Sequence, residues 1–288
     1  MAPGSIEAIH HIKVIARIAS GARLIALCLP SRKAEEGVTP GGLRIGLALC
    51  GALGLAVIAA QAKAAGAPVA VDAAIVLATD VSRSIDDEEF ALERRGYADA
   101  IRSQQLLDAI STGPHGAIAV SYVEWAGDGE EKVVVDWTVI RNLADARAFA
   151  AAMTAAPRSY LGRTAIGAAI DFSFALFAES GFDAARRVID IAGDGTSNQG
   201  RLVTEARDAA VGAGAVINGL AIYNKKAAMM GGYLAMHTHP PGGLAQYYRE
   251  NVIGGPGAFV VEIDDFRTFG EAMMRKLVNE IADARPNG

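Results

Sequence analysis

The chain contains only two cysteines, Cys28 and Cys50, and both lie within its first fifty residues. Everything that follows Cys50 is therefore unable to form a disulfide, to use a cysteine nucleophile or to bind a metal through thiolates. The sequence also has no G-x-S-x-G motif, which removes the nucleophile elbow of the α/β hydrolases. What remains for chemistry is a set of oxygen-bearing side chains and a few histidines.

Basic residues are scarce in the larger part of the chain and do not cluster. The first 64 residues hold 7 of the 27 Lys and Arg and 3 of the 32 Asp and Glu, so the rest carries 27 − 7 = 20 positive and 32 − 3 = 29 negative side chains, a net charge of −9. An acidic body without a basic patch argues against a nucleic-acid partner.

A long run without charge stands near the N-terminus. The eighteen residues 45–62 are preceded by Arg44 and end in small residues, the pattern of a secretory signal peptide with its cleavage site. We predict an uncertain N-terminal extension over 1–42, with a misassigned start site as one explanation, then a signal peptide over 43–67 and one domain over 68–288. The protein would be periplasmic or secreted. The alternative is an uncleaved segment that anchors the chain in a membrane.

Beyond residue 68, β-rich and helical patterns alternate. Apolar or β-branched runs predict strands at 73–79, 116–127, 131–140, 186–195, 216–224 and 257–263. Helical spacing predicts helices at 86–107, 143–155, 164–178, 202–211 and 266–284. The second and third strands are joined by a short Gly/Asp turn, which indicates an antiparallel hairpin with an edge strand. The alternation predicts an α/β fold, a doubly wound and mostly parallel sheet with helices on both faces.

Three oxygen-bearing side chains follow the first strand at alternate positions, Asp80, Ser82 and Ser84. Two later segments add to them: Thr164 opens a predicted helix, and Asp194 ends a predicted strand before Gly195, which would allow a sharp turn. In an open α/β sheet all these positions belong to the edge where ligands bind. The simpler interpretation is that Ser84 only caps the next helix, with Asp87 completing a capping box.

The residue types suit a hard divalent cation. Magnesium and manganese prefer oxygen ligands, and neutral hydroxyls with two carboxylates leave the ion's shell incomplete. A carboxylate from a partner could then fill the open position.

At these positions the sequence resembles the metal-ion-dependent adhesion site (MIDAS) of von Willebrand factor A domains. The segments GRTAIGAAIDFS, RRVIDIAGDGTSNQG, INGLAIYN and YYRENVIGGPGAFV further resemble a bacterial family of exported von Willebrand A-like proteins of unknown function, over about residues 70–285. The resemblance implies a six-stranded sheet with one antiparallel edge strand, and metal-dependent protein binding. It also implies that Asp80, Ser82, Ser84, Thr164 and Asp194 bind the metal directly or through water.

Other interpretations are weaker. The string GDGTSNQG begins like the magnesium motif of thiamine-diphosphate enzymes, but only Asn224 follows at a suitable distance and no second asparagine completes it. His237 and His239 could form a metal pair, although a polar surface loop is the expected place for them. Arg83, between the two serines, could steer an acidic partner or simply be solvated.

We therefore expect an exported binding module, not an enzyme, that captures an acidic residue of a protein partner through Mg2+ or Mn2+, with membrane contact only through an uncleaved signal segment. A metal-dependent hydrolase using the same site is the alternative, and it would need a general base beside the metal. The sequence shows no obvious base.

Overall fold

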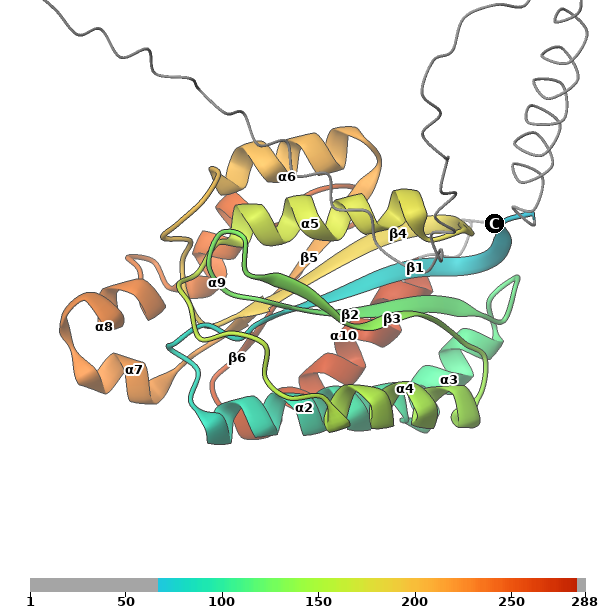
Figure 1. Cartoon of the computed structure of the whole chain (residues 1–288), viewed down its shortest axis with the longest axis horizontal. Helices are drawn as coiled ribbons and strands as arrows, with labels where there is room; N and C mark the ends of the chain where they lie inside the picture. Colours follow the sequence, from blue (N-terminus) through green and yellow to red (C-terminus); the bar gives the residue numbers. More distant parts are fainter. Residues whose placement is uncertain (1–66, 284–288) are drawn as a thin grey trace, which may run out of the picture. The chain divides into compact units, whose positions relative to one another are not determined.

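The computed structural model of the protein describes residues 67–283, which form a six-stranded sheet in the order β3-β2-β1-β4-β5-β6 (Figure 1). The strands are β1 (Val69–Asp80), β2 (Ile118–Trp125), β3 (Glu131–Ile140), β4 (Phe182–Gly193), β5 (Ala215–Ile222) and β6 (Val260–Ile263). Only the β2–β3 pair is antiparallel, and β3 forms one edge. This confirms the predicted fold class and the hairpin.

Helices cover both faces of the sheet (Figure 1). One face carries α2 (Asp87–Ile101), α3 (Gln104–Ser111), α4 (Leu143–Ala155) and α10 (Phe269–Asp283); the other carries α5 (Ile166–Glu179), α6 (Val203–Gly212) and α9 (Leu244–Tyr247). Side chains of β1 alternate between the two cores, since Ile75 and Leu77 pack in one cluster and Val76 and Ala78 in the other. A central strand buried on both sides explains the unbroken apolar run in the sequence.

Several helices differ from the prediction. The segment expected to be one helix over 86–107 is two, because Ser103 leaves the helical conformation and its side chain caps α3 by accepting from the backbone N of Leu106. The last predicted helix starts with a 3-10 turn, η2 (Phe266–Thr268), before α10. Helix α5 begins at Ile166, so Thr164 lies in the loop before the helix and does not open it.

The glycine-rich segment after β5, which we expected to be a loop, contains short helices. They are α7 (Lys225–Met230), α8 (Gly232–Thr238), α9 and the π-helical turn η1 (Tyr248–Val252). Positive φ angles at Gly231 and Gly243 separate α7, α8 and α9, and η1 continues directly from α9. The glycines suggested a loop in the sequence, but in the structure they lie at the ends of short helices of one or two turns.

The strand order of the sheet changes sides at β1, because the strands before β4 are added on one side of β1 and the later strands on the other. The chain passes from β1 to β2 on one side of it, and later returns to β4 on the other side. The carboxyl ends of β1 and β4 therefore lie side by side at the point where ligands bind in open α/β sheets. Asp80 is the last residue of β1 and Asp194 directly follows β4.

The predicted extension over 1–42 and the predicted signal peptide, apart from its last residue, lie outside the described residues. Within 67–283, no helix combines the length and the apolar character needed to cross a bilayer.

Candidate metal centre

Asp80 lies at the base of the candidate site and is fully buried. Its Oδ1 accepts a 2.7 Å hydrogen bond from the backbone N of Ser82, which fixes the turn after β1. Its Oδ2 is buried and has no hydrogen-bond partner among the described residues. An unpartnered buried carboxylate oxygen is costly unless it gains a proton or another group to bind.

A chain of hydroxyl groups connects the other predicted ligands. Ser84 Oγ donates to Asp194 Oδ1 at 2.6 Å, and Ser84 Oγ lies 3.1 Å from Ser82 Oγ. Thr164 Oγ1 in turn donates to Ser82 Oγ at 3.3 Å. All five predicted residues, although they come from three distant segments, therefore meet in one network at the carboxyl edge of the sheet.

The position of Thr164 is set by a neighbouring loop. The backbone N of Thr164 donates to Asn198 Oδ1 at 3.1 Å, and the backbone N of Asn198 donates to Thr164 O at 2.9 Å. This reciprocal pair ties the loop before α5 to the loop after β4. It does the positioning that we had assigned to a helix N-terminus.

Negative charge is concentrated at the base of the site. Burial, and then the charge of Asp194, raise the pKa of Asp80 well above its usual value. Burial also raises the pKa of Asp194, against the hydrogen bonds from Ser84 and Asn224 that lower it. Glu93 of α2 is fully buried as well, and burial followed by the charge of Asp80 raises its pKa. A divalent cation would relieve this concentration of carboxylates.

The donor set suits a hard cation. Among the described residues, no group of three or more His, Cys, Asp and Glu side chains is arranged to hold a metal. A metal at this edge would therefore depend on the hydroxyls of Ser82, Ser84 and Thr164 together with the two carboxylates. Oxygen donors of this kind, with an unpartnered Asp80 oxygen among them, fit Mg2+ or Mn2+.

Arg158 supports the site and was missed in the sequence. Its Nη2 donates to the carbonyl oxygens of Val81, Ser82 and Ile85, at 2.9, 2.9 and 2.8 Å. The guanidinium therefore binds the backbone of the whole D-x-S-x-S turn, and its positive charge lowers the pKa of Asp80. No signal in the sequence separates it from the other arginines.

Asn224 is a second residue whose role the sequence did not reveal. It follows β5, is fully buried, and donates from Nδ2 to Asp194 Oδ2 at 2.7 Å and to Ser84 O at 3.0 Å. Its Oδ1 caps α7 by accepting from the backbone N of Ala227. We had noted Asn224 only as part of a thiamine-diphosphate motif; its position after a strand was the usable signal.

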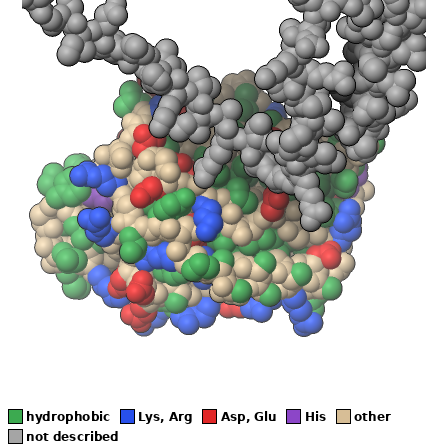
Figure 2. All heavy atoms as spheres, viewed as in Figure 1, with side chains coloured by type: hydrophobic (Ala, Val, Ile, Leu, Met, Phe, Trp, Pro, Cys, Tyr) green, Lys and Arg blue, Asp and Glu red, His purple; other side chains and the backbone are tan. Residues whose placement is uncertain are grey.

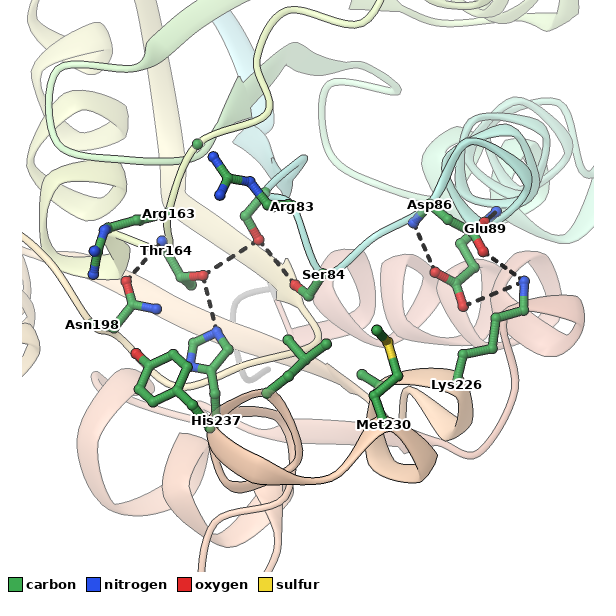
Figure 3. A pocket seen from close by; sticks show the side chains of 15 residues that line it. Arg83, Ser84, Asp86, Glu89, Arg163, Thr164, Asn198, Lys226, Met230 and His237 are labelled. Atoms are coloured by element: carbon green, nitrogen blue, oxygen red, sulfur yellow. Dashed lines mark hydrogen bonds and ion pairs between the residues drawn. The ribbon is translucent and has the colours of Figure 1, made fainter.

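His237 contradicts our expectation of a surface loop. It lies on α8, is 6% exposed, and its Nε2 is 3.1 Å from Thr164 Oγ1 (Figure 3). Burial lowers the pKa of its imidazole. His239, by contrast, packs edge-on against Tyr223, with ring centroids 3.9 Å apart. The two histidines thus do not form a metal pair.

Two smaller interpretations also change. Asp86 is the N-cap of α2 and forms a capping box with Glu89. Ser84 therefore does not cap this helix, and its hydroxyl donates to Asp194 in the site. Gly195 has no left-handed φ. Its lack of a side chain is explained instead by His237, since a Cβ at Gly195 would lie 2.3 Å from Nε2 of that ring.

A cavity of ≈ 540 Å3 opens above the hydroxyls, as Figure 3 shows. Its floor includes Ser82, Ser84 and Thr164, and its wall on one side is formed by α7 and α8. Arg83 is exposed and lines the cavity. A ligand must therefore reach the oxygen network through a recess beside α7 and α8.

Comparisons with known proteins agree with the fold. A family profile with the description "Protein of unknown function (DUF1194)" matches residues 70–285. No curated protein matches the chain. Solved structures with the same fold include proximal thread matrix protein 1 from the mussel byssus, which is 16% identical with a TM-score of 0.52, over 75% of this chain and 48% of that one.

A von Willebrand factor type A protein from Catenulispora acidiphila is 15% identical, with a TM-score of 0.50, over 73% of this chain and 43% of that one. The mussel protein has also been solved with a zinc-occupied MIDAS motif (17% identity, TM-score 0.49, 75% of this chain and 49% of that one). The chain spans about half the length of these proteins or less. The first mussel structure and the Catenulispora protein show that this chain has a von Willebrand A-like fold.

Proposed function

The chain belongs to the family described as "Protein of unknown function (DUF1194)", and we propose that it is an exported protein-binding module that works through a divalent metal ion. The ion, Mg2+ or Mn2+, would be held by Asp80, Ser82, Ser84, Thr164 and Asp194. An acidic side chain of a protein partner would complete its coordination. Export rests on the uncharged segment over 45–62.

The proposal of a bound metal rests on one observation. Asp80 Oδ2 is buried and has no hydrogen-bond partner among the described residues, and it lies at the base of a network of hydroxyls and carboxylates. A folded protein rarely leaves a buried polar oxygen without a partner. A bound cation, or water held by that cation, supplies the missing partner and offsets the repulsion between Asp80 and Asp194.

The surroundings of the site support a protein partner. Large apolar side chains gather on the projecting end of the molecule formed by α7 and α8 (Figure 2). Met229, Met230 and Met236 are 86%, 76% and 72% exposed, and Tyr233 is 64% exposed. Exposed apolar groups next to a recess are typical of interaction surfaces, and methionine adapts to varied partners. Arg83 at the mouth of the cavity would attract an acidic residue.

Thermal unfolding with and without Mg2+ or Mn2+ tests the metal. Stabilisation by about 2.7 kcal/mol is expected at a hundredfold excess of ion over its dissociation constant. Asp80→Ala should lose this gain. Asp183→Ala, an exposed carboxylate at the opposite end of β4, is the matched control and should keep it. Equal stabilisation of all three proteins would place the ion elsewhere.

A partner is tested by affinity capture from extracellular or periplasmic fractions. Proteins that bind in Mg2+, are released by a chelator and are not retained by Asp80→Ala support the proposal. Retention that is the same for Asp80→Ala and in chelator would show binding that does not use the site.

A metal-dependent hydrolase remains the second candidate because the structure supplies a base that the sequence did not show. His237 lies next to Thr164 and its imidazole is buried. Turnover of p-nitrophenyl phosphate or acetate in Mn2+, lost in both Asp80→Ala and His237→Gln, would favour this function over binding.

A further inference from the structure

His237 is placed as a ligand would be. Its Nε2 is 3.1 Å from Thr164 Oγ1 and faces the cavity floor (Figure 3). Two ligands at right angles around one ion, each about 2.1 Å from it, are about 3.0 Å apart. The neighbouring separations in the network, 3.1 Å between the two serine oxygens and 3.3 Å between Ser82 and Thr164, have the same size. The imidazole nitrogen thus continues the row of oxygen donors.

The ring is held in this orientation from its other side. Nδ1 lies 3.2 Å from Thr196 Oγ1, and the backbone N of Thr196 donates to His237 O at 3.0 Å. A metal would require the tautomer in which Nδ1–H donates to Thr196 Oγ1 and Nε2 presents its lone pair to the site, in place of the tautomer in which Nε2–H donates to Thr164 Oγ1. Metal-binding histidines are commonly fixed by such a second contact.

Gly195 gives the ring its place. A Cβ at this position would lie 2.3 Å from Nε2 and 2.8 Å from both neighbouring ring carbons. The residue next to the predicted ligand Asp194 therefore has to be glycine for the imidazole to reach the network. Three separate features, the contact with Thr164, the support from Thr196 and the space at Gly195, serve one orientation of one side chain.

We propose that His237 Nε2 is a nitrogen ligand of the metal, supplied by α8 and added to the hydroxyl donors Ser82, Ser84 and Thr164, with the carboxylates of Asp80 and Asp194 acting through water, since no three His and Asp side chains are arranged to bind one ion directly among the described residues. The proposal rests on the proposed function, since it presumes a metal at this place. An imidazole nitrogen favours Mn2+ over Mg2+ and Zn2+ over both. A nitrogen that binds the metal is not available as a general base, so this role also argues against the hydrolase.

Binding of Mg2+, Mn2+ and Zn2+ to the purified, tag-free protein by titration calorimetry tests the assignment. His237→Gln should weaken Zn2+ and Mn2+ binding about 10- to 100-fold and change Mg2+ binding less than about threefold. His239→Gln removes a nearby histidine that packs on Tyr223 and should bind all three ions like the unaltered protein. An equal loss for all three ions in His237→Gln would mean a structural role only and would overturn the proposal.

Electron spin echo spectroscopy of the Mn2+-loaded protein gives a readout that a structural role would not produce. The unaltered protein and His239→Gln should show modulation from a directly bound nitrogen, and His237→Gln should not. Gly195→Ala keeps the histidine but takes away its space, so it should also lose the nitrogen signal.

The two proposals fail in different ways. Mn2+ binding that depends on Asp80, without a nitrogen signal and without an effect of His237→Gln, would overturn the role of His237 and leave the metal site standing. Absence of any Asp80-dependent ion binding would overturn both.

Discussion

Asn224 Nδ2 donates a 2.7 Å hydrogen bond to Asp194 Oδ2, while the other oxygen of this carboxylate accepts from Ser84. Both oxygens are thus oriented by donors from other segments. Asn224 follows β5 and Ser84 follows β1, so the carboxylate of Asp194 is fixed by both neighbours of β4 in the sheet. A carboxylate held in this way is ready to face a cation without rearrangement.

Replacing Asn224 by alanine should therefore weaken metal binding. Loss of a side chain that orients a metal ligand typically costs about 10- to 100-fold in affinity, and titration calorimetry with Mn2+ measures it. Asn251→Ala is the control, because Asn251, on η1, donates to the backbone O of Tyr247 on α9, away from the site. An unchanged affinity in Asn224→Ala would show that Asp194 does not need this bond.

Arg158 provides a second test, on the backbone of the site. Arg158→Met keeps much of the aliphatic stem but removes the donor to three carbonyl oxygens of the D-x-S-x-S turn. Hydrogen bonds from a charged donor contribute about 1.5–3 kcal/mol each and do not add fully. We expect a loss of about 2–4 kcal/mol in the free energy of unfolding, measured in urea, and weaker metal binding.

Arg147→Met, an exposed arginine on α4, is the matched control. The result that would contradict the role of Arg158 is an unfolding curve for Arg158→Met that coincides with that of the control.

The sequence predicts the skeleton of this protein and only part of its site. Strands such as β1 are recognisable because burial on both faces demands an unbroken apolar run, and Asp80 stands out because it ends that run. The carboxyl ends of parallel strands lie at the same edge of a sheet, so the predicted topology alone places Asp80 and Asp194 close together.

The site residues that the sequence did not reveal contact partners that are far away along the chain. Arg158 reaches a turn more than seventy positions away, and His237 reaches Thr164 across a similar distance along the chain. Neither has a pattern at neighbouring positions that would reveal its partner. Helix α8, which carries His237, has seven residues, too few for a helical period to emerge from a glycine-rich segment.

Glu93 makes the stability of the protein depend on pH. It is fully buried, neither of its oxygens has a hydrogen-bond partner among the described residues, and burial raises its pKa well above 4.5. The folded state therefore keeps this proton at pH values where the unfolded chain has lost it. The free energy of unfolding must fall as the pH rises from about 4.5 toward the pKa of the folded state.

Glu93→Gln removes this dependence. Relative to the unaltered protein, the variant should gain up to about 1.4 kcal/mol of stability for each pH unit across that range. Urea unfolding in chelator at pH 5, 6 and 7 measures the gain, with Glu88→Gln on the exposed side of the same helix as control. A difference between variant and unaltered protein that stays constant with pH would mean that Glu93 is ionised in the folded state.

The buried ion cluster on α10 supports the sheet without contributing to the site. Lys276 is fully buried, with Nζ 2.7 Å from Asp190 Oδ1 on β4 and 2.5 Å from Glu280 Oε1. Asn218 Nδ2 on β5 also donates to Glu280 Oε1, at 2.9 Å. Burial raises the pKa of Asp190 to about 7, although the charge of Lys276 acts in the opposite direction. Lys276 thus compensates the charge of two carboxylates whose burial would otherwise destabilise the fold.

Lys276→Met should lower the free energy of unfolding by about 3–5 kcal/mol, because it leaves both carboxylates buried without their cation. The triple variant Lys276→Met, Asp190→Asn, Glu280→Gln should recover a large part of this loss, since no uncompensated charge remains. Lys132→Met, exposed on the edge strand β3, is the control for loss of a lysine. Urea unfolding compares the four proteins, and calorimetry with Mn2+ should give the same affinity for each. If the triple variant were as unstable as Lys276→Met, packing of the lysine stem, and not its charge, would account for the stabilisation.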